Sequence, residues 1–312
     1  MTCHNCRTET VKAGRARNGA QRYKCQHCSR RFTEQQHRLF GDDSRLPEDK
    51  ALMVLRCLLE GASVRSTGRL CDVEPKTVLR ILVLASERCE RLLGSTIVRV
   101  PVEDVQADEI WSFIGKKEKQ VRPEDDQNLG DAYTFVAMER NSKLVLNFAL
   151  GKRTQATTDI FIEGLRHATS KKEFQITTDG FAPYTTAIEN TLADRVDFAQ
   201  LIKVYRATSE GERRYSPAEV VSTQTVIGIG NPDPKRICTS HIERQNLNMR
   251  MGIRRFTRLT NAFSKKWENH WAALCVWFAF YNFCRIHQTL RITPAMAAGI
   301  TDHVWDVREM LA

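Results

Sequence analysis

The sequence predicts a multidomain α+β protein, and three observations support this fold class. Two Cys-x-x-Cys pairs near the start predict a small metal-binding domain over residues 1–45. Leucines at helical spacing predict a three-helix domain over residues 46–95. After a linker at 96–103, strand-like and helix-like stretches alternate over 104–290, which predicts a mixed sheet covered by helices. Residues 291–312 form a C-terminal segment.

The distribution of charge indicates a polyanionic partner. The 312 residues carry a net charge of +10, and residues 1–40 and 241–291 each hold nine Lys/Arg against two Asp/Glu. The rest of the chain is therefore net negative, a pattern typical of a protein that contacts DNA or RNA at two places. No apolar run follows Met1, and the most apolar stretch, residues 271–284, is too short to span a bilayer. We therefore expect a soluble, cytoplasmic protein.

The cysteine spacing predicts one structural Zn²⁺ ion. Cys3 and Cys6 are separated from Cys25 and Cys28 by eighteen residues, the spacing of a four-thiolate zinc ribbon. Four unconnected thiols are the alternative interpretation. Several basic residues of this domain are candidate DNA-phosphate contacts, although a solvated charged surface has the same composition. They are Arg15, Arg17, Arg22, Lys24, Arg30 and Arg31.

The next segment predicts a helix-turn-helix. A first helix contains the leucines of "ALMVLRCLLE" and ends near Gly61, and a short second helix runs to about Leu70. Pro75 suits the first position of a third helix. In a helix-turn-helix the N-terminal residues of this last helix reach base edges in the major groove. The candidate base-reading residues are Lys76, Thr77 and Arg80. A simple three-helix packing unit is the alternative.

From residue 104 onward the pattern predicts five strands in a mixed sheet. The element order is β-β-β-α-β-α-β-α, which resembles the RNase H-like arrangement. A polar stretch at 208–238 is predicted to be an insertion before the last helix. The predicted strands are 105–115, 132–140, 143–151, 174–179 and 199–207.

The RNase H-like arrangement implies a site made of three acids. It places one acid on the first strand, one at the end of the fourth and one on a later helix, which here are Asp108, Asp179 and Glu243. Three adjacent carboxylates repel one another unless divalent cations neutralise them, and oxygen ligands suit Mg²⁺ or Mn²⁺. Glu109 neighbours Asp108, but successive strand residues point to opposite faces, so we expect only one of them to reach the metals.

Glu243 also has a purely structural interpretation. Ser240-x-x-Glu243 matches a capping box, in which Ser240 caps a helix and Glu243 bonds a free backbone N–H. Taken alone, this motif favours the cap. The position of Glu243 after five strands and two acids favours a metal ligand instead.

Four blocks of the sequence resemble bacterial transposases of the insertion sequence one family. They are "ADEIWSFIG", "TTDGFAPY", "SHIERQNLNMR" and "YNFCRIHQTLRITPAMAAGITDHVW". The resemblance implies a DDE triad of Asp108, Asp179 and Glu243 holding two Mg²⁺ (or Mn²⁺) ions, and the family pattern favours Asp108 over Glu109. It also implies DNA contacts on or after the helix that carries Glu243. These are expected at Asn246, Arg250, Arg254 and Arg255.

The resemblance implies a transposase that binds the terminal inverted repeats of its element. It would cleave the element ends and join their 3′-hydroxyls to target DNA, acting as a homodimer or larger homo-oligomer in a bacterium or archaeon. A DNA-binding regulator without catalysis and a structure-selective nuclease are the alternatives, and an intact triad argues against the regulator. The roles of Glu109 and His287 stay open, because His287 suits either a scissile phosphate or a structural position.

Overall fold

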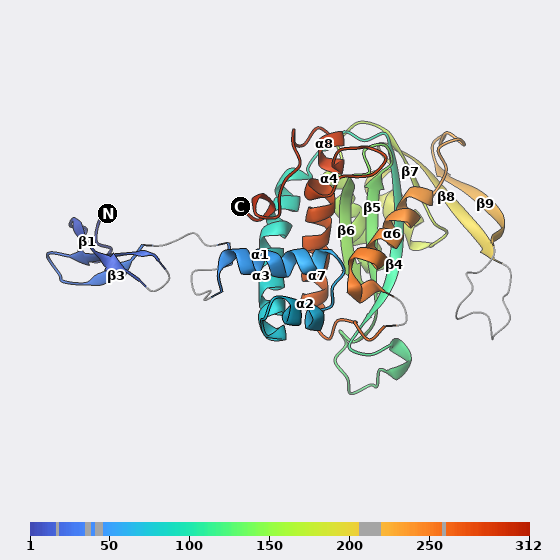
Figure 1. Ribbon diagram of the computed structural model, residues 1–312. Coiled ribbons are helices and arrows are strands. Elements are labelled where there is room, and N and C mark those ends of the chain that lie inside the picture. Colours follow the sequence, from blue (N-terminus) through green and yellow to red (C-terminus); the bar gives the residue numbers. More distant parts are fainter. Residues whose placement is uncertain (17–18, 35–38, 41–45, 206–219, 258–259) are drawn as a thin grey trace.

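The computed structural model describes residues 1–312 except 17–18, 35–38, 41–45, 206–219 and 258–259 (Figure 1). An N-terminal three-stranded sheet precedes a group of helices packed against a larger mixed sheet. This is a mixed α+β fold, as the sequence predicts. Within the described residues, no helix combines the length and apolarity needed to cross a membrane.

The N-terminal sheet is antiparallel, in the order β1-β2-β3. Its strands are β1 (Thr10–Arg15), β2 (Gln21–Cys25) and β3 (Arg31–Thr33). Arg7 and Ser29 follow the two Cys-x-x-Cys pairs with positive φ angles of 57° and 56°. The chain therefore turns sharply directly after each cysteine pair, which directs both pairs toward the same point.

Three helices follow at the places that the sequence predicts. They are α1 (Glu48–Leu59), α2 (Val64–Leu70) and α3 (Pro75–Thr96). Gly61 ends the first helical segment with a φ of +80°, a conformation that glycine adopts without strain. Ser63 caps α2 by accepting a hydrogen bond from the backbone N–H of Ser66 at 3.1 Å.

The larger sheet has six strands among the described residues, in the order β6-β5-β4-β7-β8-β9. β4 pairs with β7 and β7 with β8 in parallel, and the remaining neighbours are antiparallel. The strands are β4 (Asp104–Ile114), β5 (Gly130–Glu139), β6 (Val145–Gly151), β7 (Phe174–Thr178), β8 (Val196–Tyr205) and β9 (Val220–Ile229).

The prediction of five strands is wrong, because β9 lies inside the predicted insertion at 208–238. Its side chains are exposed along almost the whole strand, so its sequence has no alternation between a buried and a solvated face. Backbone hydrogen bonds to β8 hold β9 as the edge strand, and those bonds do not depend on side-chain type. The other five strands of this sheet, β4 to β8, and the helices between them follow the predicted order.

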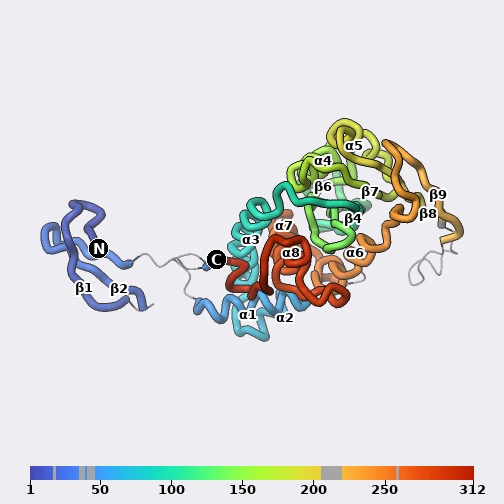
Figure 2. The backbone as a smooth tube through the Cα atoms, turned by 90° about the horizontal axis from the view of Figure 1, so that it is seen from above, coloured from blue at the N-terminus to red at the C-terminus, as the bar shows by residue number. Residues whose placement is uncertain are grey.

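Helices cover both faces of this sheet, as Figure 2 shows. One face packs against α4 (Gln155–Ala168) and α5 (Pro183–Leu192), and the other against α6 (Ser240–Gly252) and α7 (Trp267–Ala279). The C-terminal part also contains α8 (Pro294–Ala297). Short 3₁₀ or π turns complete the described chain at η1 (Glu118–Gln120), η2 (Arg254–Phe256), η3 (Phe280–Cys284) and η4 (Glu309–Leu311).

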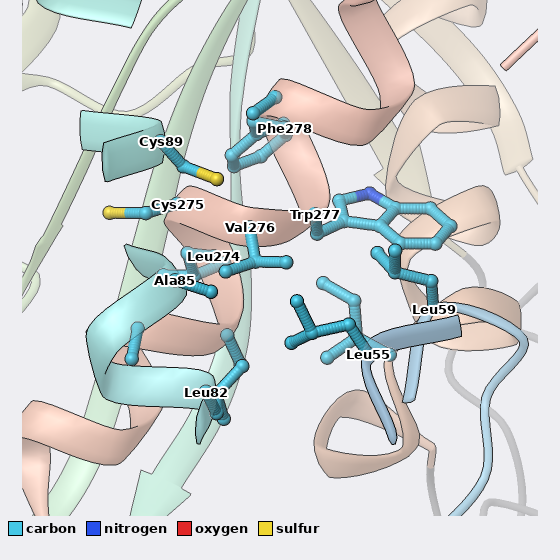
Figure 3. Close-up of a cluster of buried hydrophobic side chains, with 14 of the residues drawn as sticks. Leu55, Leu59, Leu82, Ala85, Cys89, Leu274, Cys275, Val276, Trp277 and Phe278 are labelled. Atoms are coloured by element: carbon cyan, nitrogen blue, oxygen red, sulfur yellow. The ribbon is translucent and has the colours of Figure 1, made fainter. Parts of the chain in front are cut away.

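The helices α1 to α3 share a hydrophobic core with the sheet domain. Leu55 of α1, Leu82 of α3 and Trp277 of α7 are buried in one cluster, which Figure 3 shows from close by. Near the C-terminus, the carbonyl oxygen of Leu311 accepts a hydrogen bond from Arg88 Nη1 on α3 at 2.8 Å. These contacts connect α3 to the sheet domain over much of its length.

Candidate active site and metal centres

Parallel pairing of β4 with β7 brings two of the predicted acids together. Ala107 pairs with Thr178 at the end of this ladder, so the next residues, Asp108 and Asp179, continue side by side. Carboxylate oxygens of Asp108, Glu109 and Asp179 lie within 4.8 Å of one another. A cluster of this kind matches the oxygen ligands that hard divalent cations prefer.

Asp108 and Glu109 point to opposite faces of β4, as strand geometry requires. Asp108 faces α6, because its Oδ2 accepts a hydrogen bond from Asn246 Nδ2 at 2.8 Å. Glu109 faces α5, because its Oε2 accepts a hydrogen bond from the Tyr184 hydroxyl at 3.2 Å. Both carboxylates nevertheless lie near Asp179, and which of the two reaches a metal ion stays a prediction. Asp179 follows the last residue of β7, at the edge of the sheet, where oxygens from both faces of β4 come near it.

Burial makes the charged form of Asp108 unfavourable. Desolvation, followed by the negative charges of Asp179 and Glu109, raises the pKa of Asp108 to about 8. Desolvation also raises the pKa of Glu109 and of Asp179. Asn246 Oδ1 is buried and accepts no hydrogen bond from the described residues. The site therefore has excess negative charge and a spare buried acceptor, and both features fit a divalent cation.

Glu243 lies on α6 and does not belong to the group of three oxygens. Its Oε1 accepts a hydrogen bond from the Thr239 hydroxyl at 2.5 Å and forms an ion pair with Lys203 of β8. Its negative charge nevertheless contributes to the raised pKa of both Asp108 and Asp179. Glu243 is thus close enough to influence the acids electrostatically, while its carboxylate is paired with Lys203.

The capping-box interpretation of Ser240 and Glu243 is wrong. The N-cap of α6 is Thr239, and the Glu243 carboxylate accepts from the Thr239 hydroxyl rather than from a free backbone N–H. Gln106 Oε1 instead accepts from the backbone N–H groups of His241 and Ile242, at 3.1 and 3.2 Å. A side chain from β4 therefore satisfies the first turn of α6, a contact that local sequence motifs do not reveal.

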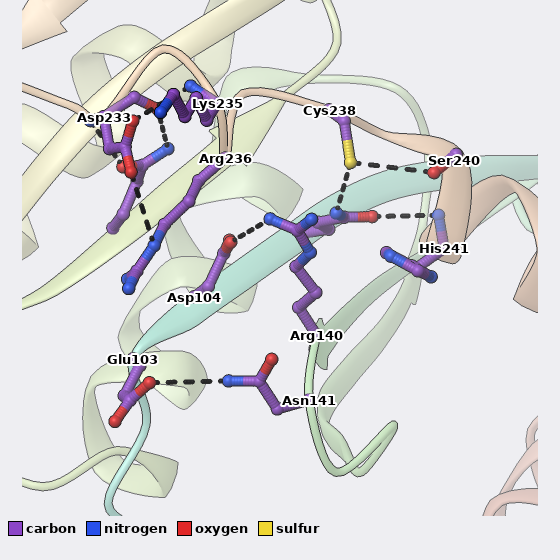
Figure 4. A network of polar contacts seen from close by, with 12 residues as sticks. Glu103, Asp104, Arg140, Asn141, Asp233, Lys235, Arg236, Cys238, Ser240 and His241 are labelled. Atoms are coloured by element: carbon purple, nitrogen blue, oxygen red, sulfur yellow. Dashed lines mark hydrogen bonds and ion pairs between the residues drawn. The ribbon is translucent and has the colours of Figure 1, made fainter. Parts of the chain in front are cut away.

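Gln106 also fixes the segment that leads into α6. Its Nε2 donates to Cys238 Sγ at 3.0 Å, and Cys238 Sγ lies 3.6 Å from Ser240 Oγ. Figure 4 shows this corner of the molecule beside the ion pair of the buried Asp104 with the half-buried Arg140. Asp104 Oδ2 and Arg140 Nη1 are 3.0 Å apart. Gln106 precedes Asp108 by two residues and so shares its face of β4.

Two basic residues of the site were missed from sequence. Lys203 pairs with Glu243, and Arg153, between β6 and α4, pairs with Glu109 through Nε and Oε1 at 2.5 Å. Their sequence contexts contain no motif, because each cation meets an acid that is remote along the chain. The guanidinium of Arg153 also lies over the ring of Phe181, with its carbon 4.1 Å from the ring centroid.

The four N-terminal cysteines converge as their spacing predicts. The Sγ atoms of Cys3 and Cys28 are 3.6 Å apart and those of Cys6 and Cys25 are 3.4 Å apart. Zinc–thiolate bonds of about 2.3 Å in a tetrahedron place the sulfurs about 3.8 Å from one another. The backbone N–H of Cys28 and the hydroxyl of Thr8 lower the pKa of Cys25 to about 5, which favours the thiolate. The cluster can bind Zn²⁺.

The predicted DNA-contacting residues of the N-terminal part lie mainly on the surface. Arg15, Arg22, Arg30 and Arg31 are exposed and Lys24 is half-buried, whereas Arg17 lies outside the described residues. On α3, Lys76 and Arg80 are exposed and Thr77 is half-buried, all within the first two turns. The exposed side chains of this set are therefore accessible to a binding partner.

The predicted contacts after Glu243 have different surroundings. Arg254 is exposed and Arg250 is half-buried near the end of α6. Arg255 is held inside the protein: its Nη1 donates to Ser264 Oγ at 3.0 Å and to the carbonyl oxygen of Asn269, and burial lowers its pKa to about 10. These contacts through Nη1 give Arg255 a structural role, and its contact with DNA stays a prediction. The sequence does not distinguish a half-buried arginine such as Arg255 from an exposed one such as Arg254.

His287 lies in a hydrogen-bonded turn near the C-terminus. Its Nδ1 is 3.0 Å from Thr289 Oγ1, and its backbone N–H donates to the carbonyl oxygen of Ile292 at 2.9 Å. Burial and the charges of Lys143 and Arg285 lower its pKa. These contacts agree with the structural interpretation of this histidine.

Comparisons with known proteins return weak structural similarities to transposases. The chain matches no protein-family model and no curated protein. It is similar to a piggyBac transposase in a synaptic complex with hairpin DNA, at 9% identity and a TM-score of 0.39, over 89% of this chain and 71% of that one. It is also similar to Mos1 in a pre-cleavage transpososome, at 16% identity and a TM-score of 0.21, over 52% of this chain and 61% of that one. Superpositions this loose do not establish a function.

Proposed function

We propose that this chain is a DDE transposase that cleaves DNA and transfers strands with the help of divalent metal ions. The observation that carries the proposal is the meeting of Asp108 with Asp179 beside the helix that bears Glu243. Three elements that are remote in sequence each contribute one of these acids. Burial and repulsion between neighbouring carboxylates raise the pKa of Asp108. A bound divalent cation would offset both effects, so these acids suit a cation-binding site.

Asp108, Asp179 and Glu243 would hold two Mg²⁺ or Mn²⁺ ions. Bound ions of this kind activate an attacking oxygen and stabilise the leaving oxygen in phosphoryl transfer. For Glu243 to participate, its carboxylate has to exchange Lys203 for a metal ion. Asn246 would orient Asp108 through the hydrogen bond between them. Arg250 and Arg254, on and after α6, would contact DNA phosphates near the site.

The N-terminal half would recognise the terminal inverted repeats of the element. In this proposal the four cysteines bind one structural Zn²⁺, and Lys76, Thr77 and Arg80 at the start of α3 read base edges. The shared core of α1, α3 and α7 would keep this reading helix in a defined position relative to the acids. Since two element ends must join one target, the active form would be a homodimer or larger, acting in the cytoplasm of a bacterium or archaeon.

An assay of end cleavage and strand transfer tests the proposal. The substrate is a duplex carrying the inverted repeats that flank the gene, in Mg²⁺. Asp108→Asn and Asp179→Asn should each lower the rate by several orders of magnitude, and combining them should add little because the acids act as a unit. Glu173→Gln is a matched control, since this exposed acid precedes the opposite end of β7 from Asp179. Full activity of either Asn variant would refute the proposed site. Cleavage without joining would favour a nuclease.

A further inference from the structure

Glu109 is an acid of the site whose two carboxylate oxygens are both held by other side chains. Arg153 Nε lies 2.5 Å from Oε1, and the Tyr184 hydroxyl donates to Oε2 at 3.2 Å. The Glu109 side chain is only 3% exposed, and Tyr184 is fully buried. To bind a cation, Glu109 would have to leave a charged partner and a buried hydroxyl without an acceptor, which is costly.

Arg153 links Glu109 to the turn that carries Asp179. Its Nη2 lies 3.8 Å from Asp179 Oδ2, and its guanidinium covers the Phe181 ring. The backbone N–H of Phe181 in turn donates to Asp179 Oδ1 at 3.1 Å. Arg153 therefore contacts this turn at the Asp179 carboxylate and at the Phe181 ring, while the Nε of Arg153 is bound by Glu109.

The distances show how Arg153 divides its charge between the two acids. Its short contact is with Glu109, and the contact with Asp179 is more than 1 Å longer, at 3.8 Å against 2.5 Å. Glu109 thus keeps the guanidinium from binding Asp179 closely. Without the charge of Glu109, Arg153 would turn to Asp179 and compete with a metal ion for its oxygens.

We propose that Glu109 is a positioning residue and not a metal ligand. It retains Arg153, and Arg153 held in this way orients the Asp179 turn without occupying the oxygens that Asp179 offers to a cation. This inference rests on the proposed function, because it takes Asp108, Asp179 and Glu243 as the metal ligands.

Binding of Mn²⁺ to the zinc-loaded, full-length protein tests this role without any catalytic readout. Calorimetric titration of Mn²⁺ should show binding to the wild type and its loss in Asp108→Asn. Glu109→Gln should bind Mn²⁺ about tenfold more weakly, because the released Arg153 competes for Asp179. The double variant Glu109→Gln/Arg153→Gln should recover binding to within about threefold of the wild type. Tyr184→Phe, which removes one hydroxyl but no charge, is the matched control and should change binding by less than about threefold.

Two results would overturn the inference. One is a double variant that binds Mn²⁺ as poorly as Asp108→Asn, which would show that competition by the released Arg153 is not the cause of the loss. This comparison stands even where Glu109→Gln alone fails to fold, since the double variant removes the charge of Arg153 together with that of Glu109. The other is a folded Glu109→Gln protein that binds Mn²⁺ like the wild type, which would exclude competition by Arg153. Normal binding by Asp108→Asn and Asp179→Asn would instead reject the proposed metal site itself.

Discussion

Asn246 on α6 donates a hydrogen bond of 2.8 Å from Nδ2 to Oδ2 of Asp108 on β4. This contact and the bonds of Gln106 to the first turn of α6 fix the helix against the strand that carries the acids. The position of Glu243 relative to Asp108 therefore depends on polar contacts of β4 as well as on the apolar core beneath α6.

Replacing Asn246 should weaken both the site and the fold. In Asn246→Ala, Asp108 loses a buried hydrogen-bond donor, and we expect the free energy of unfolding to fall by about 1–2 kcal/mol. Cleavage in Mg²⁺ should fall as well, because Asp108 is no longer oriented. Urea unfolding and the cleavage assay measure the two effects. Asn248→Ala, on the same helix but bonded to Gln245 rather than to an acid, is the control. An Asn246→Ala protein with unchanged cleavage would show that this bond does not orient Asp108.

Glu243→Gln separates a metal ligand from a structural role. Gln keeps the size of the side chain and still accepts a hydrogen bond from Thr239, but it removes the charge that a cation needs. We expect cleavage and strand transfer to fall by several orders of magnitude while DNA binding stays near the wild type. Stability should change little, because Glu243 is 43% exposed and such ion pairs contribute little to folding. Near wild-type joining of DNA ends would reject Glu243 as a ligand.

The cysteine cluster should contain about one zinc ion per chain. The double variant Cys25→Ser/Cys28→Ser removes two of the four thiolates, so we expect loss of the metal and of the ordered N-terminal sheet. Metal analysis by mass spectrometry, together with proteolysis of the N-terminal sheet, measures both. Cys57→Ser is the control, since this thiol lies on α1, outside the cluster. Freshly purified protein without zinc would contradict the prediction.

Lys76→Ala and Arg80→Ala should reduce sequence-specific DNA binding. If these exposed side chains at the start of α3 reach base edges, affinity for the inverted repeats should fall by about ten- to a hundredfold. Affinity for random duplex at the same salt concentration should fall much less. Fluorescence anisotropy with both DNAs measures the ratio. Equal losses on the two DNAs would mean that the residues contact phosphates only.

His270 should make the fold sensitive to acid. It is fully buried between Ser112 and Ser264, and burial followed by the charge of Arg255 lowers its pKa from 6.5 to about 3. Because the unfolded chain takes up a proton below pH 6.5 and the folded chain does not, acidification favours unfolding. This residue should cost about 1.4 kcal/mol of stability per pH unit between roughly pH 6 and pH 4. In His270→Gln the free energy of unfolding should fall less steeply with decreasing pH, by about 1.4 kcal/mol per pH unit. Urea unfolding at each pH measures this difference. Parallel curves for the two proteins would contradict the assignment.

Much of this organisation was determined by local sequence. The spacing of Cys3, Cys6, Cys25 and Cys28 brings the thiols together because short turns follow each pair. Pro75 and Gly61 delimit the helices through their own backbone preferences. The order of β4 to β8 along the chain follows from apolar periodicity. Parallel pairing of β4 with β7 then places Asp108 beside Asp179.

Tertiary structure decided the features that depend on partners remote in sequence. β9 is a strand because β8 offers it a ladder of backbone hydrogen bonds, and its exposed side chains carry no signal of that pairing. The carboxylate of Glu243 is bound by Thr239 and Lys203, and that of Glu109 by Arg153 and Tyr184. Local patterns record backbone preference and burial, whereas the choice of partner for a charged side chain is made only when distant segments pack together. For this protein the sequence determined which acids are present, and packing determined what each of them contacts.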